Sequence, residues 1–405
     1  MISQRRDWLH DWHVNPSVNK DYDFVDGLRG IAILLVIGCH LVYTNPLSAN
    51  LTRFIGGVIS GGACGVTVFF SLSGFLISWP FWKRKVKGQA GVIPSGYAWR
   101  RFWKIYPPLA LSVVLLTPIY ILRSHDRSFV PLALQWMAGL PLFKPVSGAL
   151  NPVMWSLVVE VHFYILLPLV FVALKKVPAR TTLWIVFVAF LVIPTAWRWF
   201  NAANGVYFTL HPQINVHFPS MLDAFAFGIL VAGLDNLQLL RKPWACLGDA
   251  GLVLLLVALI VFSWMGLYSS QSVFVRSEVL LLTATVASFF LLFYAADPNH
   301  PRSIALSVPW LRWCGLISYE WYLFHQPIIL WVRALLGPTG GNVFKYSAIV
   351  AISVITSCFL AAVVYRYFSL PILKYGRSKA QALKPTLTSG PGALRELEKT
   401  TKVLP

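Results

Sequence analysis

Two ionisable side chains, Arg29 and His40, flank an apolar run near the start of the chain, in the segment DGLRGIAILLVIGCH over residues 26–40. Their eleven-residue spacing is about three turns of α-helix, so they would share a face within roughly 20° and lie about 16 Å apart. Ionisable groups are costly inside a membrane and usually face a functional interior. Because histidine titrates near neutral pH, His40 could accept a proton from a hydroxyl group. The competing interpretation is a hydrogen-bonded core histidine.

A carboxylate interrupts a second apolar run, NPVMWSLVVEVHFYILLP, over residues 151–168. Glu160 and Tyr164 are one helical turn apart and would therefore share a face. A carboxylate inside a membrane needs a partner or a water-filled cavity. His162 would project from a different face, so it is a weaker candidate than Glu160.

Two further runs carry polar groups at membrane depth. The run WCGLISYEWYLFHQPIILW, over residues 313–331, holds Glu320, Tyr322 and His325, a dense polar set for a membrane helix, and Pro327 should kink it. Asp223 lies near the outer boundary of the run that starts FPSMLDAFAFG at residue 218, where an interfacial structural role and a catalytic role are both open.

Cations gather between residues 83 and 104, in KRKVK and in YAWRRFWKIYPP. They could bind anionic lipid headgroups, as basic segments beside a membrane often do. Arg100, Arg101 and Lys104, however, lie on one turn that leads into an apolar helix, where they could hold a phosphorylated ligand. Ser73 lies with small neighbours on a helix face that either another helix or a ligand could approach.

The elements that must position these residues are transmembrane helices. The chain is 57% hydrophobic and 12% charged, about half the charged content of soluble domains. Its apolar blocks have the length that crosses a bilayer as helix, which predicts an all-α polytopic membrane protein. We expect about ten spans: 29–45, 62–82, 105–122, 153–174, 183–200, 219–234, 248–268, 279–296, 312–332 and 345–366. The shorter segment 129–143 is expected to be re-entrant or interfacial.

The basic residues indicate the orientation of these spans. If the N-terminus is cytoplasmic, 26 of the 34 lysines and arginines fall on the inner side. This asymmetry fits the positive-inside rule with both termini cytoplasmic. The net charge of +19 is then a topology signal, and nucleic-acid binding is excluded.

Three regions are expected along the chain: a polar cytoplasmic segment 1–25, a transmembrane domain 26–370 and a basic flexible cytoplasmic tail 371–405. The first residues contain no apolar signal-peptide core, so the first span should direct insertion. None of the five cysteines forms a CxxC pair, and no metal-binding spacing such as HExxH occurs. We therefore expect no metal. The residues alone leave two functions open, a membrane group-transfer enzyme and a proton-coupled transporter.

The motifs resemble membrane acyltransferase family 3, whose members O-acylate bacterial glycans and some secondary metabolites. Six segments carry the resemblance, in family order, over about residues 22–370: DGLRG with the R-x10-H pair Arg29 and His40, GVTVFFSLSGFLIS (65–78), RRFWKIYP (100–107), WSLVVEVHFYILLP (155–168), DAFAFG (223–228) and SYEWYLFHQP (318–327).

The resemblance implies transfer of an acyl group, commonly acetyl, from cytoplasmic acyl-CoA to a hydroxyl of a carbohydrate or related acceptor, at the bacterial inner membrane. His40 would be the catalytic base and Arg29 its inner-side partner. Glu160 would belong to the catalytic set. The residues expected to bind the acyl-CoA donor are Arg100, Arg101, Lys104 and Ser73. The residues expected on the side of the acceptor are Tyr164, Asp223, Tyr322 and His325.

Two positions depart from the family pattern. Thr67 stands where the family often has Asp, and Lys104 stands where it usually has a second arginine. Lysine keeps the charge but loses the bidentate geometry of a guanidinium. We also expect no extracytoplasmic hydrolase-like domain of the kind that some members carry at the C-terminal side.

Overall fold

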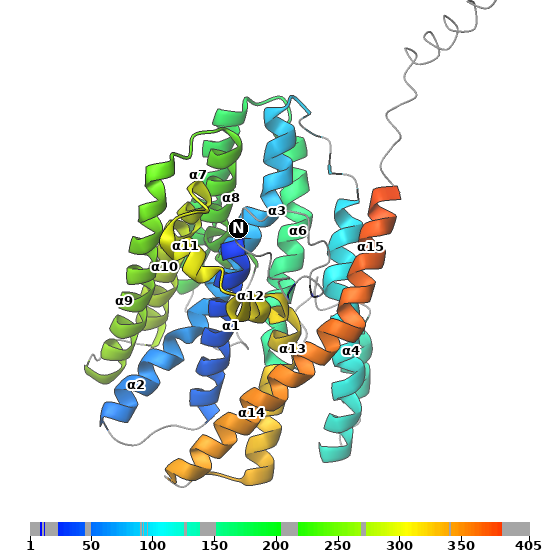
Figure 1. Ribbon diagram of the computed structural model, residues 1–405, viewed down its shortest axis with the longest axis vertical. Coiled ribbons are helices and arrows are strands. Elements are labelled where there is room, and N and C mark those ends of the chain that lie inside the picture. The colour runs from blue at the N-terminus through cyan, green and yellow to red at the C-terminus, as the bar shows by residue number, and fades with distance from the viewer. Residues whose placement is uncertain are drawn as a thin grey trace, which may run out of the picture.

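The computed structural model describes residues 9, 12, 23–44, 50–89, 91, 93–94, 96–124, 128–137, 151–203, 218–268, 273–339 and 342–382. These residues form a bundle of helices, with no strand among them (Figure 1). The all-α prediction is confirmed. In chain order the α-helices are α1 (Asp23–Thr44), α2 (Asn50–Ser60), α3 (Gly65–Val86), α4 (Tyr97–Ser124), α5 (Phe129–Met137), α6 (Trp155–Ala173), α7 (Ala179–Ala203), α8 (Leu222–Asn236), α9 (Leu247–Tyr268), α10 (Val273–Leu291), α11 (Pro301–Leu306), α12 (Pro309–Leu316), α13 (Ser318–Leu336), α14 (Val343–Val364) and α15 (Leu370–Ala382).

Short 3-10 turns precede or follow several of these helices, namely η3 (Gly61–Cys64), η5 (Pro152–Met154), η6 (Phe218–Met221), η7 (Lys242–Cys246) and η8 (Leu292–Ala296). A π-helical segment, η9 (Tyr365–Ser369), joins α14 to α15.

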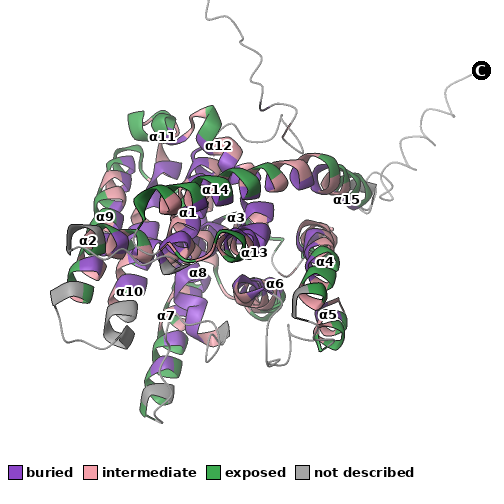
Figure 2. Ribbon diagram, turned by 90° about the horizontal axis from the view of Figure 1, so that it is seen from below, coloured by how far each residue is buried: buried purple, intermediate pink, exposed green. Residues whose placement is uncertain are grey.

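Eight helical stretches of the described chain are long and apolar enough to cross a membrane. They are Asp23–Val42, Arg53–Val86, Tyr97–Leu122, Pro152–Ala173, Ala179–Phe200, Lys242–Gly266, Val279–Ala296 and Val343–Ala380. Their outward faces are apolar: Leu122, Trp199 and Phe359 are 75%, 74% and 69% exposed. Figure 2 shows how the helices are turned, with buried residues inward and exposed residues outward. The lengths of these helices and their exposed apolar side chains are those of a multi-pass membrane protein.

The other two predicted spans, 219–234 and 312–332, correspond to interior helices. The α8 helix has only 15 residues and is buried over nearly its whole length. The second segment is not one crossing, because the backbone turns at Ile317 and divides it into α12 and α13. The prediction of a single helix over 312–332 is therefore wrong in its first turns, where α12 packs across the start of α1 instead.

Glycines permit this packing against α1. A Cβ on Gly30 would overlap the backbone carbonyl of Leu311, and a Cβ on Gly315 would overlap that of Asp26. The helices can approach so closely only because both positions lack a side chain. The glycines of DGLRG therefore fix α12 beside Arg29.

A second close approach joins α3 to α8. Gly74 lies against the carbonyl of Phe225 and Gly228 against that of Ser71, so neither position has room for a Cβ. The Ser71 hydroxyl donates a 2.7 Å hydrogen bond to the Ala224 carbonyl across the same contact. These small residues anchor α3, the helix that carries Ser73, to the buried core.

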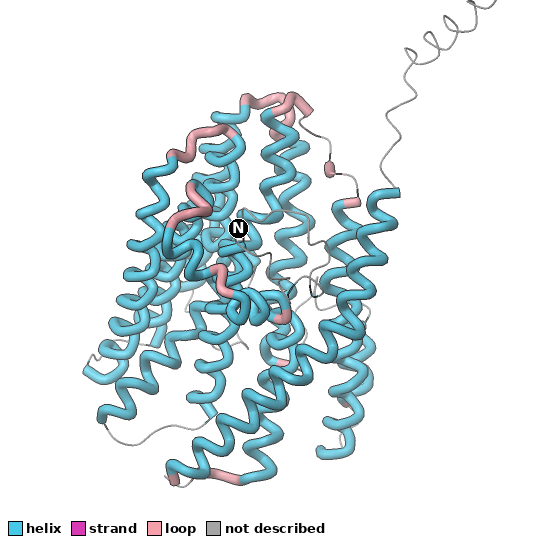
Figure 3. Tube along the Cα trace, viewed as in Figure 1, coloured by secondary structure: helices cyan, strands magenta, loops and turns pink. Residues whose placement is uncertain are grey.

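The loops after α3, α6 and α8 close one end of the bundle (Figure 3). Lys85 Nζ donates to the carbonyl of Leu174 at 2.8 Å, and Trp79 Nε1 donates to Asp235 Oδ2 at 2.7 Å. These three loops, all predicted to lie on the inner side, are thus at the same end of the bundle.

The last helix packs on α4. The α15 helix runs beside α4 in Figure 1, and the rings of Tyr375 and Trp103 are 5.6 Å apart. Helix continues to Ala382, about a dozen residues past the boundary expected at residue 370. Residues 383–405, which make up most of the expected tail, lie outside the described residues, as do most of residues 1–22.

Candidate active site

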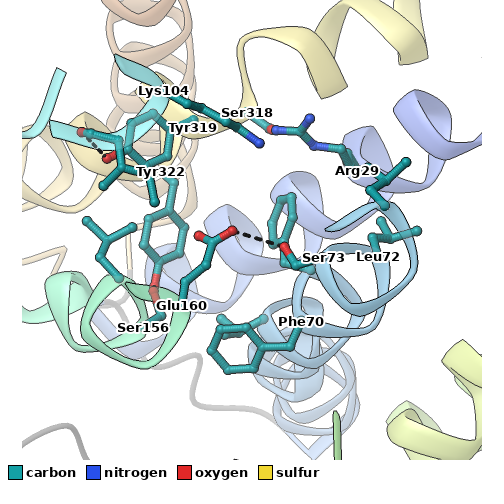
Figure 4. A pocket seen from close by; sticks show the side chains of 15 residues that line it. Arg29, Phe70, Leu72, Ser73, Lys104, Ser156, Glu160, Ser318, Tyr319 and Tyr322 are labelled. Atoms are coloured by element: carbon teal, nitrogen blue, oxygen red, sulfur yellow. Dashed lines mark hydrogen bonds between the residues drawn. The ribbon is translucent and has the colours of Figure 1, made fainter. Parts of the chain in front are cut away.

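A cavity of about 70 Å³ lies among α1, α3, α4, α6 and α13. Such a space holds a few water molecules or a group of similar size. Figure 4 shows Arg29 and Lys104 on one side of the cavity, with Glu160 and Ser73 facing them. The lining combines these polar groups with aromatic and aliphatic side chains: Arg29, Val66, Phe69, Phe70, Leu72, Ser73, Leu76, Lys104, Ile105, Ser156, Leu157, Glu160, Ser318, Tyr319 and Tyr322.

Glu160 is the hydrogen-bonded centre of this cavity. Its Oε1 accepts a 2.6 Å hydrogen bond from the Tyr164 hydroxyl and a 3.0 Å bond from the Ser73 hydroxyl. The first bond follows from the i, i+4 spacing on α6, and the second ties α6 to α3. Lys104 lies within electrostatic range of Glu160, of Arg29 and of the buried Glu320. The carboxylate thus faces two cations across the cavity.

Arg29 enters the cavity from the first turns of α1. Its Nη2 donates to the Ser318 hydroxyl at 3.1 Å. Ser318 is the first residue of α13, directly after the break at Ile317. The break between α12 and α13 therefore positions the hydroxyl that holds the guanidinium.

His40 and His325 form a pair that does not belong to the cavity lining. His325 Nε2 lies 3.2 Å from His40 Nδ1, and the two ring centroids are 4.9 Å apart. His325 is fully buried and His40 is half-buried. The two histidines that the sequence suggested from different helices therefore lie in contact.

Tyr322 stands between the pair and the cavity. Its ring lies 5.7 Å from that of His325, while its hydroxyl accepts from Ser156 at 2.8 Å and donates to the Val153 carbonyl at 2.9 Å. Tyr322 is also part of the cavity wall. One helix, α13, therefore presents residues to both polar centres.

Pro327 shapes α13 at this point. Proline lacks an N–H, so the carbonyl four residues earlier loses its helical donor. That carbonyl, on Leu323, accepts a 2.6 Å hydrogen bond from Nδ2 of the buried Asn151. Asn151, which precedes the η5 turn before α6, thereby links this turn to α13 two residues before His325.

The predicted basic set divides between two environments. Lys104 lines the cavity, whereas the Arg101 guanidinium lies over the rings of Tyr164 and Tyr97, at 5.4 and 5.8 Å. Arg100 lies within electrostatic range of Arg101, of Arg84 from the KRKVK segment and of Arg377, neither of which was in the predicted donor-binding set. This arginine cluster (Arg84, Arg100, Arg101 and Arg377) comes from α3, α4 and α15.

Asp223 lies elsewhere, in a buried ion pair with Arg198. Its Oδ2 is 2.7 Å from Nη2 of Arg198, whose Nη1 also donates to the Ser220 carbonyl at 2.6 Å. Neither residue lines the cavity. Nδ1 of His162, the weaker histidine, lies 2.8 Å from the Val158 carbonyl on its own helix.

Ser318 and Arg377 were not predicted as site residues. Ser318 is in the motif SYEWYLFHQP, but the predicted span 312–332 placed it inside one continuous helix rather than at the start of α13. Arg377 lies in the segment expected to be a tail. Among the described residues, no cluster of three or more His, Cys, Asp or Glu side chains could hold a metal ion.

Comparison with known sequences matches residues 22–366 to the family described as an acyltransferase domain, acyltransferase family 3. The peptidoglycan O-acetyltransferase OatA of Listeria monocytogenes is 26% identical over 388 residues, covering 87% of this chain and 56% of that protein. The O-acetyltransferase OatA of Staphylococcus aureus is 25% identical, with 89% and 58% covered.

The acyltransferase MdmB of Streptomyces mycarofaciens is 25% identical over 362 residues, covering 84% of this chain and 87% of that protein. The chain thus spans a little over half the length of the OatA proteins and most of the length of MdmB. No solved structure matches the chain. Because the family match extends over most of the sequence and includes every helix of the cavity, the chain belongs to acyltransferase family 3.

Proposed function

We propose that this protein is a membrane O-acyltransferase that moves an acetyl group from acyl-CoA to a hydroxyl of a carbohydrate or related acceptor. The observation that carries the proposal is the cavity in which Arg29 and Lys104 face Glu160, in a chain of this family. The relatives named as O-acetyltransferases support acetyl as the acyl group. The same ionisable groups would suit a proton-coupled transporter, but family membership favours group transfer.

The donor binds on the basic side of the cavity in this proposal. The arginine cluster holds the phosphates of CoA, because guanidinium groups pair with phosphate bidentately. Arg101 connects this cluster to the cavity through its contact with Tyr164, which in turn binds Glu160. The pantetheine arm then passes Lys104 and Arg29 on its way toward His40.

His40 is the general base of the transfer. The acceptor oxygen forms a bond to the acyl carbon while the acceptor proton moves to His40. The carbon–sulfur bond breaks, and the departing CoA thiolate takes that proton, which restores His40. A positioned base of this kind contributes about 10²–10⁴-fold in rate. Glu160 completes the set by orienting polar groups within the cavity.

The first experiment measures acetyl transfer by the purified, membrane-reconstituted protein with labelled acetyl-CoA and a panel of glycan acceptors. We expect His40→Ala to abolish transfer. His162→Ala is the matched control, because both histidines bind the carbonyl four residues earlier at 2.8 Å. Transfer by His40→Ala at the control's rate would refute the base assignment. No transfer from acetyl-CoA to any acceptor, with other acyl donors active, would refute the acetyl donor.

A further inference from the structure

Both ring nitrogens of His325 have their protonation set by fixed neighbours. Nδ1 lies 2.8 Å from the Tyr322 carbonyl and 3.1 Å from the Trp321 carbonyl. Carbonyl oxygens only accept hydrogen bonds, so Nδ1 must carry the proton. In the neutral ring, Nε2 then holds a lone pair and is an acceptor. His325 therefore presents an acceptor atom to its neighbour.

The neighbour of that acceptor is His40. Its Nδ1 lies 3.2 Å from His325 Nε2 and 2.8 Å from the Val36 carbonyl. Since both of these atoms are acceptors, His40 Nδ1 carries a proton and donates to them. The basic nitrogen of His40 is consequently Nε2.

We infer that His325 is a positioning residue for His40: it orients the His40 ring, fixes its tautomer together with Val36, and stabilises the imidazolium formed when Nε2 takes the acceptor proton. This inference rests on the proposed function, in which His40 is the base. A donor that becomes charged makes a stronger hydrogen bond, so the His40–His325 bond strengthens as the reaction proceeds. Stabilisation that increases in the transition state raises kcat rather than lowering KM.

The surroundings of His325 support this role over direct contact with an acceptor. The side chain is fully buried, and the carbonyls that hold it lie on its own helix, where Pro327 and Asn151 fix the local geometry. Trp321 holds α13 to α14 through a 3.0 Å bond from its Nε1 to the Ser357 hydroxyl. The ring of His325 is thus held in place beside His40, with Nδ1 bonded to carbonyls of its own helix and Nε2 bonded to His40.

A pair of variants of similar length tests the inference. Glutamine places a side-chain oxygen near the position of the histidine Nε2, whereas methionine has a similar length and no strong acceptor. We expect His325→Met to lower kcat roughly 10- to 100-fold, a part of the contribution of a positioned base. His325→Gln should recover most of that loss, and the KM for acetyl-CoA should change little in both variants.

Nitrogen-15 NMR of the labelled protein reads the tautomer directly. We expect His40 to be protonated at Nδ1 and unprotonated at Nε2 in the resting protein. Equal kcat values for the Gln and Met variants, or a proton on His40 Nε2, would overturn the inference while leaving His40 as the base. Full activity of His40→Ala would instead overturn the proposed function on which it rests.

Discussion

The hydroxyl of Tyr164 donates a 2.6 Å hydrogen bond to Glu160, one turn earlier on α6, and the Arg101 guanidinium lies 5.4 Å from the same tyrosine ring. The ring face of Tyr164 therefore contacts the Arg101 guanidinium, and its hydroxyl contacts the Glu160 carboxylate. Tyr164 joins the arginine cluster to the cavity, a connection that the sequence alone does not reveal.

The first prediction concerns this contact. Tyr164→Phe keeps the ring over Arg101 but removes the hydrogen bond to Glu160, whereas Tyr164→Leu removes both. Hydrogen bonds to charged groups contribute about 1.5–3 kcal/mol. We expect kcat to fall roughly tenfold in Tyr164→Phe, and the KM for acetyl-CoA to rise as well in Tyr164→Leu. Steady-state kinetics with both substrates separate the effects; identical kinetics for the two variants would contradict the role of the ring.

The second prediction tests the arginine cluster. Arg377→Ala should raise the KM for acetyl-CoA roughly 10-fold or more, since a charge-assisted bond to phosphate would be lost. The KM for the glycan acceptor should stay constant. Lys176→Ala, an exposed cation beside Leu174 at the same end of the bundle, is the control. An equal effect of both substitutions would indicate general electrostatic attraction rather than a site.

The third prediction concerns the contact that positions Arg29. Gly315→Ala would drive a methyl group into the Asp26 carbonyl, and overpacking of this kind costs about 1–3 kcal/mol. We expect a lower thermal midpoint and reduced kcat, because α12 and Ser318 would shift from Arg29. Gly56→Ala is the control, since its Cβ would meet Val42 at an ordinary 3.5 Å and no other atom of the described residues within 4 Å. If Gly315→Ala matches this control in both measurements, the close packing does not position Arg29.

The fourth prediction separates a structural from a catalytic role for Asp223. Asp223→Ala would leave the buried Arg198 without its carboxylate, which typically costs about 3–5 kcal/mol. Replacing both, as Arg198→Met with Asp223→Leu, should recover most of that stability. Because the pair lies outside the cavity lining, we expect the double variant to keep near-normal kcat per folded molecule. A stable but inactive double variant would instead support the acceptor-side role that the family resemblance implies for Asp223.

Hydrophobic length and pattern were sufficient to predict the all-helical membrane fold, because crossing a bilayer imposes a length that apolar runs reveal directly. The break at Ile317 was not predictable from the same signal, since α12 and α13 are both apolar and the break depends on how Gly315 packs against α1.

The candidate residues were recognisable by type, but their grouping was not. Helical periodicity relates Glu160 to Tyr164 and Arg29 to His40, which are on the same helices. It says nothing of His40 beside His325, 285 residues later, or of Ser73 beside Glu160, 87 residues later. Such contacts arise from helix packing. Arg377 was missed for a related reason: its helix is stabilised by tertiary contact with α4 rather than by an apolar run of its own.

The π-helical segment Tyr365–Ser369 gives the long helix one surplus residue between α14 and α15. Removing a residue from an ordinary α-helix rotates everything beyond it by about 100°. Removing one here would instead convert the wide turn into a regular one and leave both flanking faces in register. Gly376 would then still meet Trp103 on α4. A protein with a one-residue deletion within 365–369 should therefore still fold, whereas the same deletion in the middle of α14 should prevent folding. The π-helical segment is thus the place where the length of the chain can vary without turning α15 away from α4.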